Sequence, residues 1–435
     1  MQGNSMSICR QFTKYVSFSI FSMLGLSLYV LADTFFIARG IGSDGLTALN
    51  LVLPIYSLMN GLGLLLGMGG ATRYAIFLSE GRTREGTVIF SMTAVTAVLL
   101  GVLFLSAGLA ICGPLIKILG ADAAVFPLAE SYLKVIFSFS PGFLLNNVMV
   151  CFIRNDKAPN LSMAAMLTAS ASNIFLDYLF IFPFGMGMFG AALATGLAPL
   201  FSLCVLSSHF LRNKNRFRMT GKGWNTGGLL RVFSLGLPAF LTEISSGLVI
   251  LVFNRILLGI SGNTGVAAYG IIANLALIGT AIFTGIGQGL QPLASNSFGT
   301  GDFKKAKRFL YLALVLASVL GICFYLCGVM FPTEIASVFN REAQAELENI
   351  AVNGIRLYFL AFLCMGANIV LSSFFSAVSF PKQAFAISAA RGFLAVLPLA
   401  LILPKLLGLN GVWLVIPISE LVTLLVGAMC WRKTL

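Results

Sequence analysis

Twelve apolar stretches, each long enough to cross a lipid bilayer, constrain this chain more than any other feature of its sequence. A hydrocarbon core ~30 Å thick is spanned by about 20 helical residues. The stretches predict twelve transmembrane helices, at residues 12–38, 46–75, 87–110, 125–153, 161–183, 188–211, 228–258, 265–298, 306–330, 346–377, 384–404 and 410–431. Hydrophobic residues make up 58% of the 435 residues and charged residues only 10%, which is too apolar for a compact water-soluble fold. We therefore expect an all-α polytopic membrane protein, not a soluble enzyme, a disordered chain or a secreted disulfide scaffold.

The scarcity of reactive side chains argues against catalysis. His209 is the single histidine, which disfavours a His-ligated metal and Ser–His chemistry. The eight cysteines are scattered through apolar stretches, as is typical of small core residues rather than of a disulfide framework. The phosphate-cradling glycine loop of an ATP-driven pump is missing from the sequence. We expect neither an enzyme nor a bound cofactor.

The distribution of positive charge predicts the topology. The net charge is +13, and cytoplasmic connections of membrane proteins carry an excess of Lys and Arg. With the N-terminus in the cytoplasm, eighteen Lys and Arg residues fall in cytoplasmic connections, and four fall on the opposite side: Arg39, Lys117, Arg341 and Lys405. We predict a multi-pass protein of the cell membrane with both termini in the cytoplasm. The surplus charge then reflects topology, not nucleic acid binding. The first apolar stretch is too long for a cleaved signal peptide, so we interpret it as a retained helix.

The two halves of the chain repeat each other at an offset of about 220 residues. More glycines coincide at this offset than chance predicts for two glycine-rich windows: Gly42, Gly45, Gly67, Gly69 and Gly81 fall on Gly262, Gly265, Gly287, Gly289 and Gly301. We therefore predict two six-helix lobes, residues 1–211 and 228–435, joined by a basic linker at 212–227. An even number of helices keeps both lobes in the same orientation, as in a parallel repeat with pseudo-two-fold symmetry. Glycines in the second and eighth helices allow close helix approach.

Acidic residues inside the predicted helices indicate where function resides. Four of the fifteen lie well inside apolar stretches: Asp33, Asp177, Glu243 and Glu420. A charged side chain at the helix centre costs ~2.5–3.5 kcal/mol, so such residues usually face a cavity and act there. Asn173 precedes Asp177 by four residues and shares its helix face, which could coordinate a small cation or share a proton. The alternative is a protonated acid that holds helices together, and we favour it for Glu420, whose only polar neighbours are Ser419 and Thr423.

Several segments resemble the multidrug and toxic compound extrusion (MATE) antiporters. They are residues 32–37 (Ala-Asp-Thr-Phe-Phe-Ile), 154–159 (Arg-Asn-Asp-Lys-Ala-Pro), 173–177 (Asn-Ile-Phe-Leu-Asp) and 236–238 (Gly-Leu-Pro) with Glu243. The resemblance covers essentially the whole chain and is strongest to the bacterial multidrug export proteins. It implies multidrug efflux by alternating access: inward flow of H⁺ or Na⁺ drives the expulsion of amphipathic, cationic organic compounds. The resemblance implies small drug-like substrates and the bilayer as partners. It also implies a monomeric transporter that contributes to antibiotic resistance.

The resemblance also implies roles for individual residues. Asp33 matches the acid of the family that responds to protons or sodium, with partners in the fifth and sixth helices. The coupling set is Asp33, Asn147, Asn173, Asp177 and Thr195, with Asn146 as the alternative to Asn147. Where sodium is the coupling ion, it would bind at Asp33, Asn173, Asp177 and Thr195.

Two departures from the family pattern affect this interpretation. The first helix has no proline between residues 12 and 40, so proline-kinked bending of that helix is not expected. No acid lies between Glu348 and Glu420, so a sodium site in the second lobe is incomplete. We therefore assign Glu243, with Asn368, to the binding of cationic substrate.

The rival interpretation is a flippase of the related superfamily that moves lipid-linked oligosaccharides or lipids. Such a protein needs buried cationic groups for a pyrophosphate, and Lys134, Arg255 and Arg356 are the candidates. Each lies close enough to an outer surface for its side chain to reach water. The basic loop motif of major-facilitator carriers is absent from residues 79–86. With 38 Phe and 15 Met available to line a loosely selective cavity, we prefer the efflux antiporter.

Overall fold

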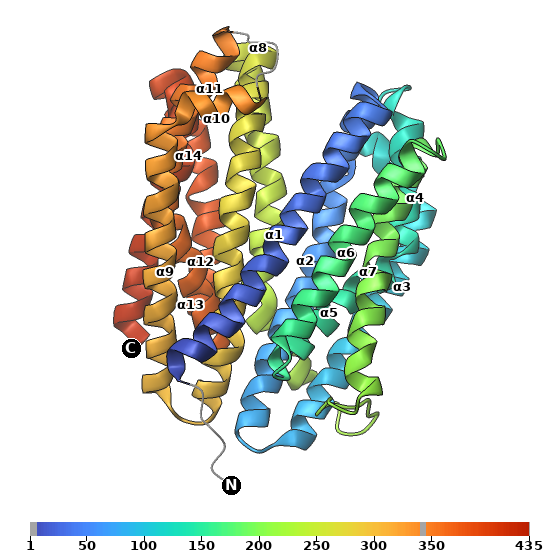
Figure 1. Ribbon diagram of the computed structural model, residues 1–435, viewed down its shortest axis with the longest axis vertical. Helices are drawn as coiled ribbons and strands as arrows, with labels where there is room; N and C mark the ends of the chain where they lie inside the picture. Colours follow the sequence, from blue (N-terminus) through green and yellow to red (C-terminus); the bar gives the residue numbers. More distant parts are fainter. Residues whose placement is uncertain (1–6, 340–344, 435) are drawn as a thin grey trace. The chain divides into compact units, whose positions relative to one another are not determined.

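The computed structural model describes residues 7–339 and 345–434, and the secondary structure in these ranges is helical throughout (Figure 1). Arg341, one of the four residues assigned to the outer side, lies outside the described residues. The helices in chain order are α1 (Ile8–Gly40), α2 (Ser43–Ser79), α3 (Thr83–Ile118), α4 (Val125–Ser138), α5 (Ser140–Asn155), α6 (Pro159–Ile181), α7 (Gly187–Leu211), α8 (Thr226–Gly299), α9 (Phe303–Met330), α10 (Pro332–Phe339), α11 (Ala345–Tyr358), η1 (Phe359–Ala361), α12 (Phe362–Ala377), α13 (Pro381–Ala389), η2 (Ala390–Leu394) and α14 (Val396–Thr434).

The predicted all-α membrane fold is confirmed. Among the described residues, ten helices are long and apolar enough to cross a membrane, and the bent pair α4–α5 raises the number to eleven. One of the ten, Pro381–Arg432, is 52 residues long, and at 1.5 Å per residue a straight helix of that length would be about 78 Å. Gly408 interrupts it with a φ of 57°, and counting each side separately gives the twelve predicted spans.

The fourth predicted span is bent because of Pro141. Helices α4 and α5 meet at an angle of 53°. Pro141 lies in the first turn of α5 and has no N–H to donate to the preceding turn. The Ser140 hydroxyl donates to the Phe137 carbonyl at 2.6 Å and lies 2.8 Å from the Gly101 carbonyl. Helix α1, by contrast, runs without a break, as expected for a segment that lacks proline.

Backbone conformations at equivalent positions confirm the internal repeat. Gly42 and Gly262 end the first helix of their halves with φ values of 92° and 60°. Gly81 and Gly301 follow the second helix with 79° and 76°. Left-handed φ values are uncommon for residues with a Cβ, so their recurrence at one offset reflects a common turn geometry. These turns therefore have the same left-handed backbone conformation in both halves.

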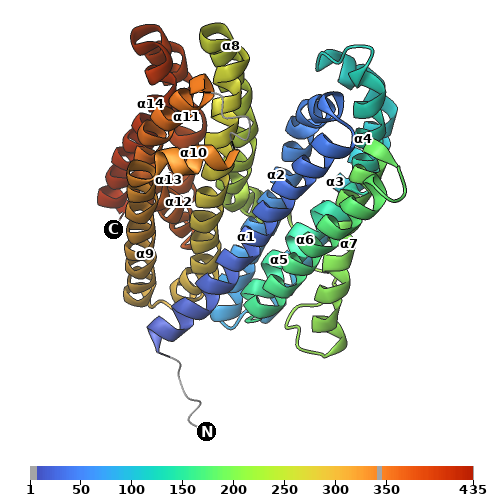
Figure 2. The ribbon, with the colours of Figure 1, turned by 45° about the horizontal axis from the view of Figure 1, so that its top comes forward.

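Packing divides the chain into two units whose boundaries differ from the predicted lobes. The N-terminal unit comprises Phe21–Ile244 and Ser295–Asp302, and the C-terminal unit comprises the residues up to Ile20, Ser245–Ala294 and Phe303–Leu435. In the N-terminal unit α6 lies beside α7, and in the C-terminal unit α9 lies beside α12 (Figure 2). The first part of α8 thus belongs to the N-terminal unit, and the first part of α1 to the C-terminal unit.

Glycines explain why these helix ends pack where they do. An added Cβ at Gly69 of α2 would overlap the Val232 carbonyl oxygen of α8, and one at Gly236 would overlap that of Leu65. In the C-terminal unit, an added Cβ at Gly289 of α8 would lie 2.6 Å from Cα of Val16 in α1. Gly69 and Gly289 are equivalent positions of the repeat, so the predicted close approach of helices is confirmed in both halves.

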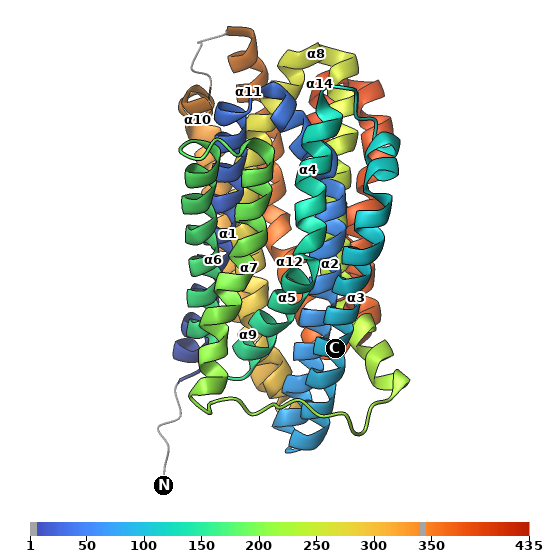
Figure 3. The same cartoon turned by 90° about the vertical axis from the view of Figure 1, so that its right-hand side faces the viewer.

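The linker after α7 packs against the N-terminal unit. Asp156 accepts hydrogen bonds from the Tyr74 hydroxyl (2.7 Å) and the Arg216 amide (3.0 Å), and it pairs with His209 at 2.8 Å. The Phe217 ring is fully buried among aromatic rings of this unit. Figure 3 shows the linker crossing the end of the unit between α7 and α8. The single histidine therefore has a structural partner.

Candidate functional site

Two acids predicted to carry the coupling come together inside the N-terminal unit. Asp33 of α1 is 7% exposed and Asp177 of α6 is fully buried. Their carboxyl groups lie within hydrogen-bonding reach of each other. The Oδ1 atom of each has no hydrogen-bond partner among the described residues. Two buried carboxyl groups in contact, each with a free acceptor oxygen, can hold a proton or a small cation between them.

The neutral residues of the predicted cluster surround Asp177. The Asn173 amide, in the orientation that satisfies both of its polar atoms, donates to Asp177 Oδ2 at 3.0 Å and accepts from the Thr195 hydroxyl at 3.3 Å. Asn173 lies one turn before Asp177, as the helix period requires, and Thr195 comes from the neighbouring α7. Tyr132 of α4, which the sequence analysis missed, lies within hydrogen-bonding reach of Thr195. The structure thus brings four of the five predicted coupling residues together.

The fifth residue, Asn147, takes part in a different group of hydrogen bonds. Its amide donates to Asn60 of α2 at 3.0 Å, and Asn60 donates in turn to Glu243 of α8 at 3.0 Å. No described hydrogen bond joins Asn147 to the two aspartates. The sequence analysis missed Asn60 because its acidic partner, Glu243, lies 183 residues away in the chain. Glu243, assigned to the second lobe, packs in the N-terminal unit because the start of α8 crosses α2 there.

A pair of tyrosines joins α1, which carries Asp33, to α2, which carries Asn60. The hydroxyl groups of Tyr29 in α1 and Tyr56 in α2 are 3.2 Å apart. Tyr29 lies one turn before Asp33, and Tyr56 lies one turn before Asn60, so each shares a helix face with an acidic or amide side chain. This hydrogen bond therefore joins α1 to α2 one helical turn from Asp33 and from Asn60.

The C-terminal unit holds a second buried acid with partners of its own. Glu420 of α14 is 2% exposed and pairs with the Arg391 guanidinium at 2.7 Å. Asn368 of α12 donates to Glu420 Oε2 at 2.7 Å and to its backbone oxygen at 2.8 Å. Arg391 lies in the π-helical turn η2, a feature that often marks functional positions. Asn368, predicted to act with Glu243, is thus hydrogen-bonded to Glu420.

The interpretation of Glu420 as a residue that joins helices needs one correction. The acid does connect α12, η2 and α14, but its partner is a cation. Arg391 is 29 residues away in sequence, so inspection of neighbouring residues could not find it. The Arg391 guanidinium already neutralises the Glu420 carboxylate, which a cation in this unit would otherwise need as a ligand.

The cationic groups considered for a flippase are on the surface, as expected for side chains that reach water. Arg255 and Arg356 are exposed, and half-exposed Lys134 pairs with Glu130. The restriction to these three residues was wrong, however. Arg154 at the end of α5 is 2% exposed, and the Arg391 side chain is 16% exposed. Both were overlooked because one lies at a helix end and the other in an apolar stretch.

Comparison with known proteins places the chain in a family. The family model described as MatE matches residues 19–179 and 238–402. The chain belongs to the MatE family. The multidrug export protein MepA of Staphylococcus saprophyticus is 25% identical over 425 residues, covering 96% of this chain and 93% of MepA. MepA of Staphylococcus aureus is 27% identical over 409 residues, covering 92% and 89%.

Solved structures share the fold of this MatE protein over nearly its full length. An outward-facing multidrug resistance MATE family transporter of the MOP superfamily superposes with a TM-score of 0.90 at 22% identity, covering 99% of this chain and 98% of that one. A MOP superfamily transporter from Pyrococcus furiosus, noted for the reverse polarity of its binding pocket, gives the same values. The predicted two-lobe MATE fold is therefore confirmed.

Proposed function

We propose that this MatE protein is an antiporter that exports amphipathic, cationic organic compounds, driven by the inward flow of protons or sodium ions. The observation that carries the proposal is the contact between Asp33 and Asp177 inside the N-terminal unit. The multidrug export proteins similar to this chain support drug-like substrates. The transporter would act as a monomer in the cell membrane, with both termini in the cytoplasm.

The aspartate pair supplies a physical basis for coupling. Two carboxylates in an apolar environment repel each other, so the pair without a cation is strained. Binding of a proton or sodium ion relieves this repulsion. Asn173 orients Asp177 for that exchange by donating to its Oδ2 atom, and Thr195 in turn donates to Asn173. The side chains around the pair therefore favour different arrangements with and without the ion, which is the differential interaction that alternating access requires.

Glu243 is the proposed attachment point for the positive charge of the substrate. Its side chain is partly exposed, and its hydrogen-bond partner among the described residues is the neutral Asn60 amide. A carboxylate with a neutral partner attracts a diffuse organic cation, whose binding is further favoured by burial of apolar area. Glu243 and Asp33 lie in the same unit, so we expect the binding of substrate and of the ion to influence each other there.

Efflux from proteoliposomes tests the proposal. We expect a cationic dye to move only when an inward proton or sodium gradient is imposed, and the two gradients applied separately identify the coupling ion. Asp33→Asn and Asp177→Asn keep the size of the side chain but remove its charge, so each should reduce gradient-driven efflux to near background. Asp44→Asn, an exposed acid in the first turn of α2, is the matched control.

Normal efflux by either Asp33→Asn or Asp177→Asn would contradict the assignment of coupling to this pair. Lipid scrambling that does not depend on any gradient would favour the flippase instead.

A further inference from the structure

An open pocket of about 430 Å³ lies where the start of α1 meets the start of α9, both in the C-terminal unit (Figure 1). We call it the α1–α9 pocket, and its lining consists of Ile8, Cys9, Lys307, Arg308, Tyr311 and Leu312. None of the coupling or substrate residues proposed above belongs to it. The pocket combines two cationic side chains with apolar ones, and no acid is among the described residues that line it.

The two cations of the α1–α9 pocket have no carboxylate partner. Neither Lys307 nor Arg308 forms an ion pair with a described residue. The Lys307 ammonium instead lies 5.3 Å from the centroid of the Phe303 ring and 5.7 Å from that of Trp431. The face of an aromatic ring attracts a positive charge but does not neutralise it, and both cations carry several N–H donors. Both groups therefore remain able to bind an anion.

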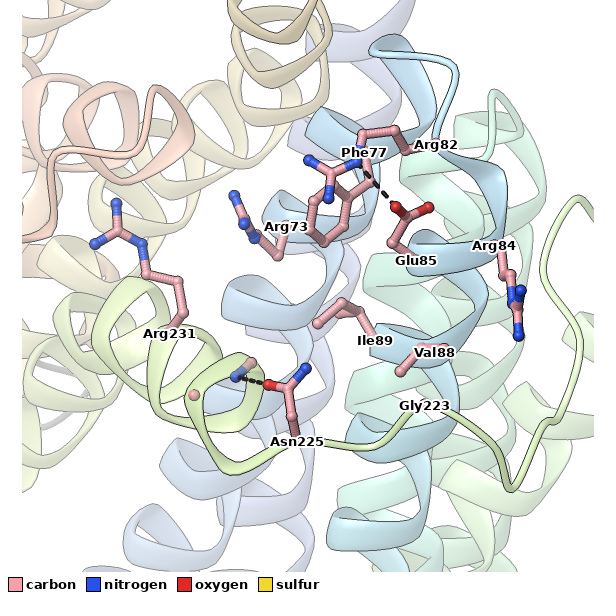
Figure 4. Close-up of a pocket in the computed structure, with 12 residues that line it drawn as sticks. Arg73, Phe77, Arg82, Arg84, Glu85, Val88, Ile89, Gly223, Asn225 and Arg231 are labelled. Atoms are coloured by element: carbon pink, nitrogen blue, oxygen red, sulfur yellow. Dashed lines mark hydrogen bonds and ion pairs between the residues drawn. The ribbon is translucent and has the colours of Figure 1, made fainter.

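A larger basic cavity in the N-terminal unit differs in this respect. It has a volume of about 520 Å³ and is lined by the end of α2, the start of α3 and the first turns of α8 (Figure 4). Its lining includes Glu85, which binds the Arg82 guanidinium at 3.0 Å. That cavity thus holds an acid of its own, whereas the α1–α9 pocket offers cations without one.

The depth of Lys307 and Arg308 along α9 suits the headgroup of a lipid. Helix α9 has 28 residues and is therefore about 42 Å long, close to the ~40–45 Å of a bilayer that includes its headgroups. The two cations come about 6 Å and 8 Å after the start of this helix, and the headgroup region on each side is about 5–8 Å thick. In the predicted topology this end of α9 faces the cytoplasmic leaflet, where anionic lipids concentrate.

Exposed apolar side chains continue from the pocket along α9. Tyr311, Val315, Val319 and Ile322 recur every three or four residues, so they share one face of the helix, and they are 68%, 43%, 53% and 48% exposed. This stripe is about 17 Å long, close to the ~15 Å half-thickness of a hydrocarbon core. Pocket and stripe together therefore match an amphiphile with an anionic head and an apolar tail, which a free phosphate does not have.

We propose that the α1–α9 pocket binds an anionic glycerophospholipid of the cytoplasmic leaflet. Lys307 and Arg308 bind the phosphate of its headgroup, and an acyl chain lies along the exposed stripe that begins at Tyr311. Because Ile8 and Cys9 of α1 line the same pocket, the bound lipid joins the start of α1 to α9. The proposal does not depend on the coupling ion or on the exported compound.

Lipid binding to the purified full-length transporter in detergent tests the site. Phosphatidylglycerol, phosphatidylcholine or inorganic phosphate is added, and the unfolding temperature and the number of bound lipids by native mass spectrometry are measured. We expect phosphatidylglycerol to raise the unfolding temperature more than phosphatidylcholine does, and phosphate to leave it unchanged. Lys307→Gln combined with Arg308→Gln should lower the apparent affinity for phosphatidylglycerol about thirtyfold, because each basic side chain near an anionic surface contributes a factor of about five.

The matched control variant carries Lys214→Gln and Arg218→Gln. These substitutions also remove one lysine and one arginine, but from exposed positions of the linker that do not line the pocket. The control variant should bind phosphatidylglycerol as the wild type does.

Three results would overturn the proposal. Equal stabilisation of the wild type by phosphatidylglycerol and phosphatidylcholine would mean that the charge of the headgroup is not recognised, and this result needs no variant to observe. Stabilisation by millimolar inorganic phosphate that competes with phosphatidylglycerol would indicate a site for a free anion instead of a lipid. Equal loss of affinity in the pocket and linker variants would mean that the response reflects net charge.

Discussion

At the residue scale, the proposed function depends on a few acidic and amide side chains inside the helices. Asp33 and Asp177 lie within hydrogen-bonding reach of each other, and Glu243 accepts a hydrogen bond from Asn60. In the C-terminal unit, Glu420 is already neutralised by Arg391. Among the acids well inside the described membrane-spanning helices, Asp33, Asp177 and Glu243 have no ion pair, whereas Glu420 has one. This asymmetry supports the proposal that coupling resides in the N-terminal unit.

Glu243→Gln should weaken the binding of cationic substrates and spare neutral ones. The substitution keeps the size of the side chain but removes the charge that attracts an organic cation. We expect the apparent affinity for a monovalent cationic dye to fall about tenfold, or ~1.4 kcal/mol, with the ion dependence unchanged. Dye binding to the purified protein at fixed pH and sodium concentration measures this loss.

The control for this prediction is Glu334→Gln, an exposed acid of α10, which should leave affinity unchanged. Equal losses for cationic and neutral substrates, with an altered ion requirement, would instead place Glu243 in the coupling network.

At the scale of helices, glycines determine how closely neighbours pack. Gly236 of α8 lies against the backbone of Leu65 in α2, so close that a Cβ would overlap a carbonyl oxygen. Backbone cannot move aside as the end of a flexible side chain can. The contact positions Glu243, which lies two turns further along α8. Helix crossing and site geometry are therefore linked.

Gly236→Ala should destabilise the protein, whereas Gly270→Ala in the same helix should not. A Cβ at Gly270 meets no atom within 4 Å, so this variant gains only helix propensity, up to about 1 kcal/mol. Forcing a methyl group against the α2 backbone should cost about 1–3 kcal/mol. Thermal unfolding in one detergent compares the two variants, and equal unfolding temperatures would show that the α2–α8 contact is looser than the structure indicates.

The ion pair that joins α14 to η2 permits a second test at this scale. Arg391→Gln leaves the Glu420 carboxylate buried with only an amide partner, and breaking such a pair typically costs about 3–5 kcal/mol. Adding Glu420→Gln removes the unpaired charge, so the double variant should recover much of the lost stability. Unfolding free energies of the two single variants and the double variant measure the coupling. Additive effects would mean that the two side chains do not stabilise each other.

At the scale of the whole molecule, two similar six-helix halves have come to differ in chemistry. The left-handed glycines recur at one offset, and so do the close contacts of Gly69 and Gly289. The acidic residues do not recur in the two halves. The first half holds the pair Asp33 and Asp177 without a cationic partner, and the second holds the ion pair of Glu420 with Arg391. Topology is also a property of the whole chain, since it depends on the summed positive charge of the connections.

Labelling of single cysteines in intact cells should confirm the predicted topology. In a variant whose eight free cysteines are replaced, a cysteine at Lys222 in the linker should resist a membrane-impermeant maleimide. One at Ala123, in the connection between α3 and α4, should react. Both positions are exposed in the structure, so both should react after lysis. The opposite pattern before lysis would mean that the termini face outward.

The sequence by itself determined the features that depend on local composition and spacing. Apolar stretches specified twelve spans because a bilayer admits only long apolar helices, and repeated glycines revealed the two halves because turns with left-handed φ require them. The period of the helix placed Asn173 beside Asp177. These properties follow from the composition and spacing of residues along the chain and need no knowledge of which helices pack together.

Only the tertiary structure decided which distant side chains meet. Asn60 and Glu243 are 183 residues apart in sequence, and Arg391 and Glu420 are 29 apart. The crossing of α8 over α2 moved Glu243 from the predicted second lobe into the N-terminal unit. Such contacts depend on the angle and position at which two helices cross. Helix crossings are determined by the packing of whole helix surfaces, and the spacing of residues along the chain does not specify that packing.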